Sequence, residues 1–429
     1  MSQDSDFFTH HPPRAWTIPI KWHKYCLRYT NSSHQASKKP PNGESKETVR
    51  LHKGTRKKMN KPAYLIDTTL REGEQSVGIH FTTGQKKSII TGLALVGVSE
   101  LEIGIASSFA GDLGNIMAFC KRHHPDLKTS LWCRCKKQDI LTAAALSPDR
   151  LSLSIPVSDL HLIKRLGKDR LWAKRSMLDA IGAALQMGLQ VSVGFEDATR
   201  ADAVFLTDMA RLAEQAGAFR IRLADTIGHA TPAGMIAMVA DVKKVLDTCE
   251  IAVHTHNDFG MATANAMAAL ESGARWADVT VLGLGERAGC ARLEELAGYL
   301  GIMLSTPGIH PRHLKPLARY VSTIIACTRE DFRPLVGEKI FTCETGLHLQ
   351  GLQRDPSTYE PYPPEQVGAT RSLLLGAKCG REALKTRLAE LGHAIDDDLL
   401  LQKTCSLRER AALFGRPLDD REILASLLS

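Results

Sequence analysis

The sequence predicts an α/β fold: a (β/α)8 barrel with a small C-terminal α-rich subdomain and a disordered N-terminal extension. Strand-like and helix-like segments alternate from residue 63 to about residue 303, and eight such repeats are typical of this barrel. A length of 429 residues leaves room for a further module. A doubly wound open sheet is the structural alternative, but no GxGxxG phosphate motif lies near the first strand.

The predicted strands are short runs rich in Val, Ile and Leu, as expected for parallel strands that are buried on both faces. Between them, apolar residues recur at i, i+3 and i+4, for example over 176–187 and 201–216, which indicates helices. Gly97, Gly188 and Gly217 each follow such a stretch, which is the usual helix stop. The strands are predicted at 63–67, 100–104, 129–133, 151–155, 190–194, 219–224, 251–254 and 278–282.

Three segments are expected: a basic extension over 1–60, a barrel catalytic domain over 61–305, and a C-terminal linker and helical subdomain over 306–429. The extension is rich in Lys, Ser, Pro, Asn and His and has no apolar periodicity, so we expect it to be disordered. A targeting peptide is an alternative that Asp4 and Asp6 disfavour. An over-long start, with Met59 as the true beginning, is a third interpretation.

The net charge of +8 comes wholly from the extension, which holds 12 Lys/Arg and 4 Asp/Glu, whereas the remainder holds 43 of each. A neutral body gives no electrostatic reason to expect nucleic-acid binding, and no run of 18 apolar residues indicates a membrane span. The ten cysteines are scattered, apart from Cys133 and Cys135, and no secretory signal precedes them. We therefore expect reduced thiols and a cytoplasmic location.

Polar residues follow the strand ends at which a barrel carries its active site. The first strand runs into Arg71 and Glu72, a cation and a carboxylate for the barrel mouth, with a surface salt bridge as the alternative. On the seventh strand, His254 and His256 point the same way because residues at i and i+2 share a face. Two neutral imidazoles and a carboxylate commonly bind a catalytic divalent ion, so Glu72, His254 and His256 are the predicted metal ligands.

Other strand ends carry further candidates. Glu196 follows the fifth strand and Thr226 the sixth. The eighth runs into a glycine-rich loop over 283–289, which contains Glu286 and Arg287 as candidate substrate-binding residues. Such a loop permits close approach of a phosphate or thioester, and a tight βα turn is the alternative interpretation.

Taken together, these segments resemble the DRE-TIM metallolyases, the family of 2-isopropylmalate, citramalate and homocitrate synthases and 3-hydroxy-3-methylglutaryl-CoA lyase. The resemblance covers about residues 62–429. Residues 67–75 match the signature that names the family, 254–258 match HxHND, and 283–289 match GxGER. Segments 100–104 and 191–200 are most similar to the nitrogen-fixation type of homocitrate synthase.

The resemblance implies a Claisen-type condensation of acetyl-CoA with 2-oxoglutarate to (R)-homocitrate and CoA, for the nitrogenase iron–molybdenum cofactor. One divalent ion (Mg, Mn or Zn) would polarise the keto group. Arg71 and Gln75 would donate hydrogen bonds to the developing alkoxide, and Thr226 would bind the C1 carboxylate.

The resemblance also implies the base that removes a methyl proton from acetyl-CoA. His348 matches a histidine that acts in the active site of the partner subunit, so an intertwined homodimer is expected. Glu196 would orient this histidine, and Tyr359 matches a tyrosine close to it. The chain departs from the common pattern at Cys290, Cys343 and Cys379, which could alter acetyl-CoA binding or metal preference because a thiolate is a softer ligand.

The choice of 2-oxo acid depends on a donor for the second carboxylate of 2-oxoglutarate. Arg134, after the third strand, is the candidate, and a solvent-facing arginine is the alternative. The nearest other functions are 2-isopropylmalate and citramalate synthase, which usually carry a further C-terminal domain for which this chain is expected to be too short. A CoA-ester lyase should lack the His348 segment, and the metal ligands disfavour a non-catalytic scaffold.

Overall fold

The computed structural model describes residues 62–106, 111–325, 333–344, 352, 355, 356, 360–377 and 379–428. The extension predicted over 1–60 lies outside these residues. Within them, the predicted (β/α)8 barrel is confirmed, because eight parallel strands close into one barrel in chain order. The closure is made by β8 pairing with β1, for example Ile66 beside Asp278.

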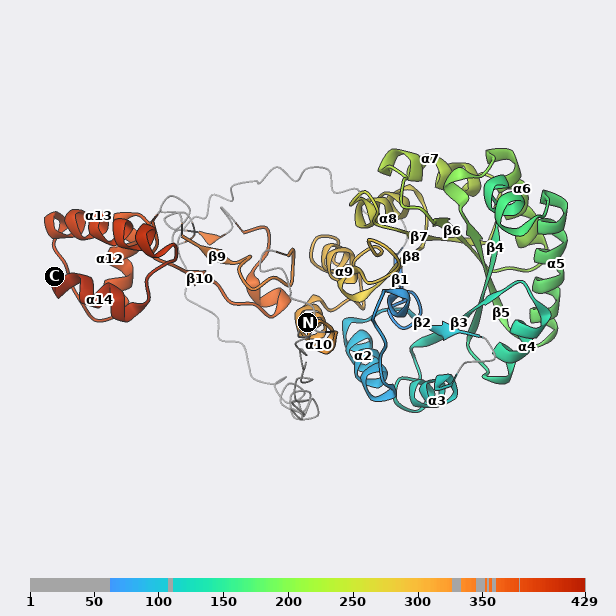
Figure 1. Ribbon diagram of the computed structural model, residues 1–429, viewed down its shortest axis with the longest axis horizontal. Helices are drawn as coiled ribbons and strands as arrows, with labels where there is room; N and C mark the ends of the chain where they lie inside the picture. Colours follow the sequence, from blue (N-terminus) through green and yellow to red (C-terminus); the bar gives the residue numbers. More distant parts are fainter. Residues whose placement is uncertain are drawn as a thin grey trace, which may run out of the picture. The chain divides into compact units, whose positions relative to one another are not determined.

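Neighbouring strands are also consecutive in the chain because each returns through a helix that packs outside the sheet. The helices form a ring around the strands (Figure 1). The strands are β1 (Tyr64–Asp67), β2 (Glu100–Ile105), β3 (Lys128–Arg134), β4 (Arg150–Pro156), β5 (Gln190–Glu196), β6 (Arg220–Asp225), β7 (Glu250–Thr255) and β8 (Trp276–Val279).

Side-chain caps fix several helix starts. Thr82 and Gln85 form a capping box before α2, and Asp169, Asp202 and Thr231 each accept an amide hydrogen bond at the start of α5, α6 and α7. The helices are α2 (Thr83–Val96), α3 (Leu113–His123), α4 (Lys137–Ala145), α5 (Arg170–Gln186), α6 (Ala203–Gln215), α7 (Pro232–Lys243), α8 (Ala262–Ser272), α9 (Leu293–Ile302) and α10 (Leu314–Ile324). Shorter turns lie at Gly73–Gln75, Leu160–Leu166, Ala198–Arg200, Val281–Gly283, Pro311–His313 and Pro364–Val367.

Charged side chains fill much of the barrel interior. Glu100 accepts two hydrogen bonds of 2.8 Å from Arg220 and one of 2.5 Å from Arg150. Two residues further along β2, Glu102 accepts from Arg222 at 2.7 Å. Buried charges are tolerated because each has an opposite charge beside it. The second of these pairs lies directly below the barrel mouth, because Glu102 also accepts from Arg71.

The bounds predicted for the last strand were wrong. The prediction was 278–282, whereas β8 runs from Trp276 to Val279. Leu282 has a φ of +60°, so the chain cannot continue as a strand. The amide of Val281 donates instead to Thr69 Oγ1 at 2.8 Å, which directs the chain back across the barrel mouth.

The predicted α-rich C-terminal part is also confirmed, and it has a hydrophobic core of its own that includes Leu384, Leu388, Leu400 and Leu407. A short parallel pair of strands precedes it, with Ser372 beside Thr342. Among the described helices, none is both long and apolar enough to cross a membrane. The elements are β9 (Thr342–Cys343), β10 (Ser372–Leu373), α12 (Arg381–Glu390), α13 (Asp397–Phe414) and α14 (Asp420–Leu428).

Candidate metal centre and active site

The turn after β1 brings two charged side chains into the barrel mouth. The carbonyl of Thr68 accepts from the amides of Arg71 at 3.0 Å and Glu72 at 2.7 Å, which winds the chain into one tight turn. Asp67 stabilises this turn by accepting from the amide of Thr69 at 2.9 Å. Arg71 and Glu72 are only 9% and 2% exposed, so the alternative of a surface salt bridge is wrong.

The two histidines from the end of β7 meet in the same space. Their Nε2 atoms are 3.2 Å apart. His254 Nδ1 lies 2.8 Å from Oδ2 of Asp278, on the neighbouring β8. A carboxylate on Nδ1 holds the proton there, which leaves the Nε2 lone pair free. Glu72 Oε2 lies 3.9 Å from His254 Nε2.

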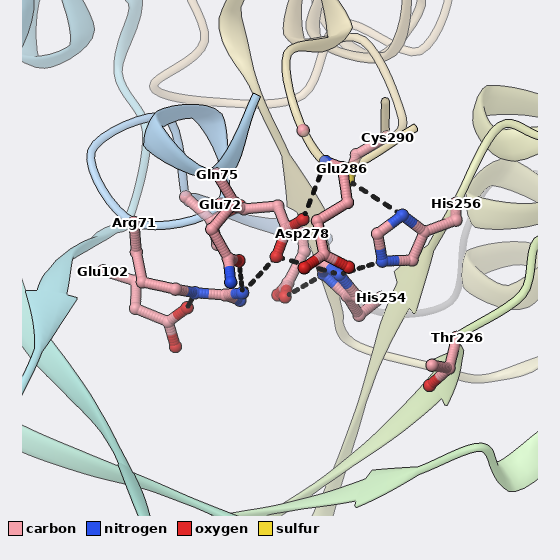
Figure 2. Close-up of polar contacts among 12 residues, drawn as sticks. Arg71, Glu72, Gln75, Glu102, Thr226, His254, His256, Asp278, Glu286 and Cys290 are labelled. Atoms are coloured by element: carbon pink, nitrogen blue, oxygen red, sulfur yellow. Dashed lines mark hydrogen bonds and ion pairs between the residues drawn. The ribbon is translucent and has the colours of Figure 1, made fainter. Parts of the chain in front are cut away.

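These residues fit a divalent cation. The donor atoms of Glu72, His254, His256 and Cys290 all lie within 4.8 Å of one another (Figure 2). Burial, helped by His254, lowers the pKa of His256 to about 3, so this imidazole is neutral, as a metal ligand must be. Burial raises the pKa of Glu72, but the opposing influence of its neighbours, of which the charge of Arg71 is the largest, brings the pKa below its ordinary value. An ionised carboxylate beside the neutral imidazole of His256 and the Nε2 of His254 is a suitable donor set.

Arg71 is held in place by three neighbours. Its Nε donates to Glu102 at 2.6 Å, and its Nη1 donates to Glu72 and, at 3.3 Å, to Gln75 Oε1. Since the Gln75 oxygen accepts from Arg71, the exposed Gln75 side chain keeps its amide nitrogen as a donor. Arg71 is therefore a fixed cation beside the carboxylate of Glu72 (Figure 2).

The glycine-rich loop after β8 contacts the metal-ligand cluster directly. The amide of Glu286 donates to Glu72 Oε1 at 3.2 Å. Gly289 has a φ of +86°, and a Cβ there would lie 1.8 Å from the carbonyl oxygen of Gly283. A Cβ on Gly285 would lie 2.8 Å from Cys290 Sγ. The glycines are thus needed for the loop to pass this close to the cluster.

Arg287 connects three loops of the barrel mouth by hydrogen bonds. Its Nε and Nη2 donate to both carboxylate oxygens of Asp258, at 2.8 and 2.9 Å, and Nη2 also donates to the carbonyl of Thr226 at 2.8 Å. The hydroxyl oxygen of Thr226 accepts from the amide of Asp197 at 2.8 Å. The Glu286 side chain is 47% exposed. The loops after β6, β7 and β8 are therefore fixed relative to one another.

Glu196 ends β5 with both of its carboxylate oxygens occupied. Arg165 donates to them at 2.9 and 2.7 Å from the helical turn at Leu160–Leu166. His348 and Tyr359 lie outside the described residues. The predicted contact between Glu196 and His348 stays a prediction.

Arg134 does not lie deep in the barrel, where a donor for a second substrate carboxylate was expected. Its side chain is 54% exposed and donates to both oxygens of Asp139, at 2.7 and 3.0 Å. Asp139 belongs to the first turn of α4, so it draws the guanidinium toward the rim. The solvent-facing alternative describes this residue better.

Several site residues were not predicted from the sequence. Asp278 orients His254, Glu102 holds Arg71, and Arg165 binds Glu196. A carboxylate inside a short buried strand was a detectable signal for Glu102 and Asp278. Arg165 carried none, because its partner belongs to a different βα unit.

Comparison with known proteins identifies the family. Residues 63–321 match the family model described as HMGL-like. The chain belongs to the HMGL-like family. The three sequence motifs therefore indicated the correct group, the DRE-TIM metallolyases. Residues 335–413 of this HMGL-like protein match a second model, described as homocitrate synthase post-HMGL domain-like.

Relatives match over most of the chain. 2-Isopropylmalate synthase 2 of Caldanaerobacter subterraneus is 37% identical over 370 residues, which are 86% of this chain and 95% of that protein. A homocitrate synthase of Frankia alni is 40% identical over 331 residues, which are 76% and 93%. A solved hydroxymethylglutaryl-CoA lyase from Pseudomonas aeruginosa superposes with a TM-score of 0.57 at 18% identity, over 62% of this chain and 94% of that one. At that identity the likeness concerns the fold alone.

Proposed function

We propose that this protein condenses acetyl-CoA with 2-oxoglutarate to give (R)-homocitrate and CoA. The observation that carries the proposal is the convergence of Glu72, His254 and His256 in a buried cluster beside Arg71, at the end of the barrel where such enzymes hold their substrates. Relatives named homocitrate synthase and the post-HMGL match at 335–413 support this reaction over others of the family.

Glu72, His254 and His256 would hold one divalent ion, Mg, Mn or Zn. When bound, such an ion acts as a Lewis acid toward the keto and carboxylate oxygens of a 2-oxo acid. Arg71 and the amide nitrogen of Gln75 donate to negative charge that develops on the keto oxygen. Because Arg71 is already held by Glu102, little reorganisation is needed when the charge develops.

Thr226 supplies a donor for the C1 carboxylate of the 2-oxo acid. Its hydroxyl oxygen already accepts from the amide of Asp197, so its hydrogen is free to point at a substrate oxygen. Arg287 and Glu286 act at the rim, where Arg287 keeps the loop that carries Thr226 in position.

His348 is the proposed base for the methyl proton of acetyl-CoA, with Tyr359 beside it, and it acts across an intertwined homodimer. The match of residues 335–413 to the post-HMGL model supports this role for the C-terminal segment. Glu196 orients the imidazole in this proposal and would share its carboxylate between His348 and Arg165.

Arg222 is a better candidate than Arg134 for the second carboxylate of 2-oxoglutarate. Its side chain is 4% exposed, and Nη1 is bound to Glu102. Among the described residues, its buried Nη2 has no hydrogen-bond partner. A carboxylate inside the barrel would satisfy that donor, which supports a 2-oxo diacid as substrate.

A product assay with a panel of 2-oxo acids tests the reaction. We expect homocitrate and free CoA from 2-oxoglutarate, and no comparable turnover with 2-oxoisovalerate or pyruvate. Selective product from 2-oxoisovalerate would instead support the second candidate, 2-isopropylmalate synthase, which the 37% identical relative favours. His256→Ala should abolish turnover, and a folded His256→Ala protein with wild-type rates would exclude this metal site.

The product would serve the nitrogenase iron–molybdenum cofactor in this proposal. The resemblance of 100–104 and 191–200 to nitrogen-fixation enzymes supports the assignment. Deleting the gene for this protein from its host should abolish nitrogenase activity, and added homocitrate should restore that activity. A host without nitrogenase would refute this part of the proposal while leaving the condensation intact.

A further inference from the structure

Cys290 belongs to the metal-ligand cluster but has no role in the proposed condensation. Its side chain is 2% exposed, and its thiol is free. Its Sγ lies 3.8 Å from His256 Nδ1, and it shares the 4.8 Å cluster with donor atoms of Glu72, His254 and His256. In Figure 2, a dashed line joins Cys290 to a ring nitrogen of His256, and Cys290 lies beside Glu286.

Several backbone features hold Cys290 in this position. An isolated antiparallel bridge sets Cys290 opposite His256, so the two residues stay side by side. The amide of Cys290 donates to the carbonyl of Gly283 at 3.0 Å. Gly285 leaves the space that the sulfur occupies, since a Cβ there would come within 2.8 Å of Sγ and 3.3 Å of Glu72 Cγ. The loop therefore presents the sulfur to the cluster.

We propose that Cys290 is a fourth ligand of the metal ion and that its sulfur makes the centre selective for thiophilic ions. This inference rests on the proposed metal site of the condensing enzyme. Two imidazoles, one carboxylate and one sulfur are a donor set for Zn²⁺, Fe²⁺ or Co²⁺, whereas Mg²⁺ prefers oxygen ligands throughout. The centre binds Zn²⁺, Fe²⁺ and Co²⁺ in strong preference to Mg²⁺.

Core packing alone explains the position of Cys290 less well than metal ligation does. A buried cysteine usually packs as a small apolar group among hydrophobic side chains. Cys290 is buried, but its sulfur shares a cluster with a carboxylate and two imidazoles. Its Sγ lies 3.8 Å from His256 Nδ1 and within 4.8 Å of a Glu72 carboxylate oxygen.

Cobalt(II) spectroscopy on the full chain tests the proposal, because sulfur ligation gives a near-ultraviolet charge-transfer absorption that nitrogen and oxygen ligands do not give. Metal-free protein is titrated with Co²⁺ in the absence of thiol reductants. We expect one equivalent to produce this absorption in wild type and in Cys135→Ser, a control that removes a thiol outside the cluster. Cys290→Ser should still show the visible bands of bound cobalt but should lose the charge-transfer absorption.

Competition dialysis gives a second readout. The preference of wild type for Zn²⁺ over Mg²⁺ should fall by more than about tenfold in Cys290→Ser, and should be unchanged in Cys135→Ser. The assignment would be overturned if Cys290→Ser kept the charge-transfer absorption. It would also be overturned if wild type bound Co²⁺ at this site without showing that absorption.

An incorrect role for Cys290 and an incorrect metal centre would give different experimental results. If wild type forms homocitrate and binds Co²⁺ without sulfur ligation, only the role of Cys290 is lost. If His256→Ala binds Co²⁺ as tightly as wild type, the whole metal centre is wrong, and the role of Cys290 is lost with it.

Discussion

At the scale of single residues, the site depends on partners that hold each functional group in one orientation. His254 is held by Asp278, Arg71 by Glu102, and Glu196 by Arg165. Each partner comes from a different strand or loop than the residue it orients. The functional groups themselves follow strand ends and so were predictable, whereas their partners depend on which strands become neighbours.

Replacing Asp278 with Asn should weaken metal binding by about 10- to 100-fold, because His254 loses the carboxylate that fixes its tautomer. Isothermal titration with Zn²⁺ measures the effect. Asp149→Asn is the control, since the Asp149 carboxylate accepts from the amide of Thr129 outside the site. Unchanged affinity in a folded Asp278→Asn protein would show that Asp278 has no orienting role.

At the scale of elements, the loop after β8 is the critical segment. It provides an amide to Glu72, carries Arg287 toward Asp258, and brings Cys290 beside His256. The GxGER motif was predictive of this loop, but its contact with Glu72 was not foreseen. Close approach of the loop to a protein carboxylate explains the glycines without requiring a phosphate.

Gly289→Ala should disrupt this loop, since φ is +86° and the new Cβ would meet the Gly283 oxygen at 1.8 Å. We expect metal affinity to fall at least about tenfold, measured by the same titration. Gly182→Ala is the matched control. Gly182 lies inside α5 with open space around its Cβ position, so that change should stabilise the protein by about 0.5–1 kcal/mol in urea unfolding. Wild-type affinity in Gly289→Ala would contradict the role of the loop.

At the scale of the whole molecule, the ionic layers couple distant parts of the barrel. Glu100 on β2 binds Arg220 on β6, and Glu102 binds Arg222 across the same interior. Burial raises the pKa of Glu100, but Arg220 and Arg150 more than offset this and bring it down to about 2. A depressed carboxyl pKa stabilises the fold above the unfolded-state value of about 4.3, and that stability is lost as the pH falls toward 2.

Glu100→Gln should therefore reduce the acid sensitivity of folding between about pH 4.3 and 2. It should also lower the free energy of unfolding at pH 7 by about 3–5 kcal/mol, because Arg220 keeps a buried charge without its partner. Urea unfolding across this pH range measures both effects. Glu390→Gln, in a surface pair with Arg387, should change stability by less than about 0.5 kcal/mol. An unchanged pH slope in Glu100→Gln would exclude this role of the ionic layer.

The local sequence by itself determined the alternation of strands and helices, the residue types of the candidate metal ligands and the family. Each of these depends on short-range patterns: apolar runs, the i and i+2 spacing of His254 and His256, and compact motifs. Only the tertiary structure decided that Asp278 orients His254, that Arg134 turns outward to Asp139, and that β8 ends at Val279. These outcomes depend on barrel register and on competition between distant partners, which no local pattern encodes.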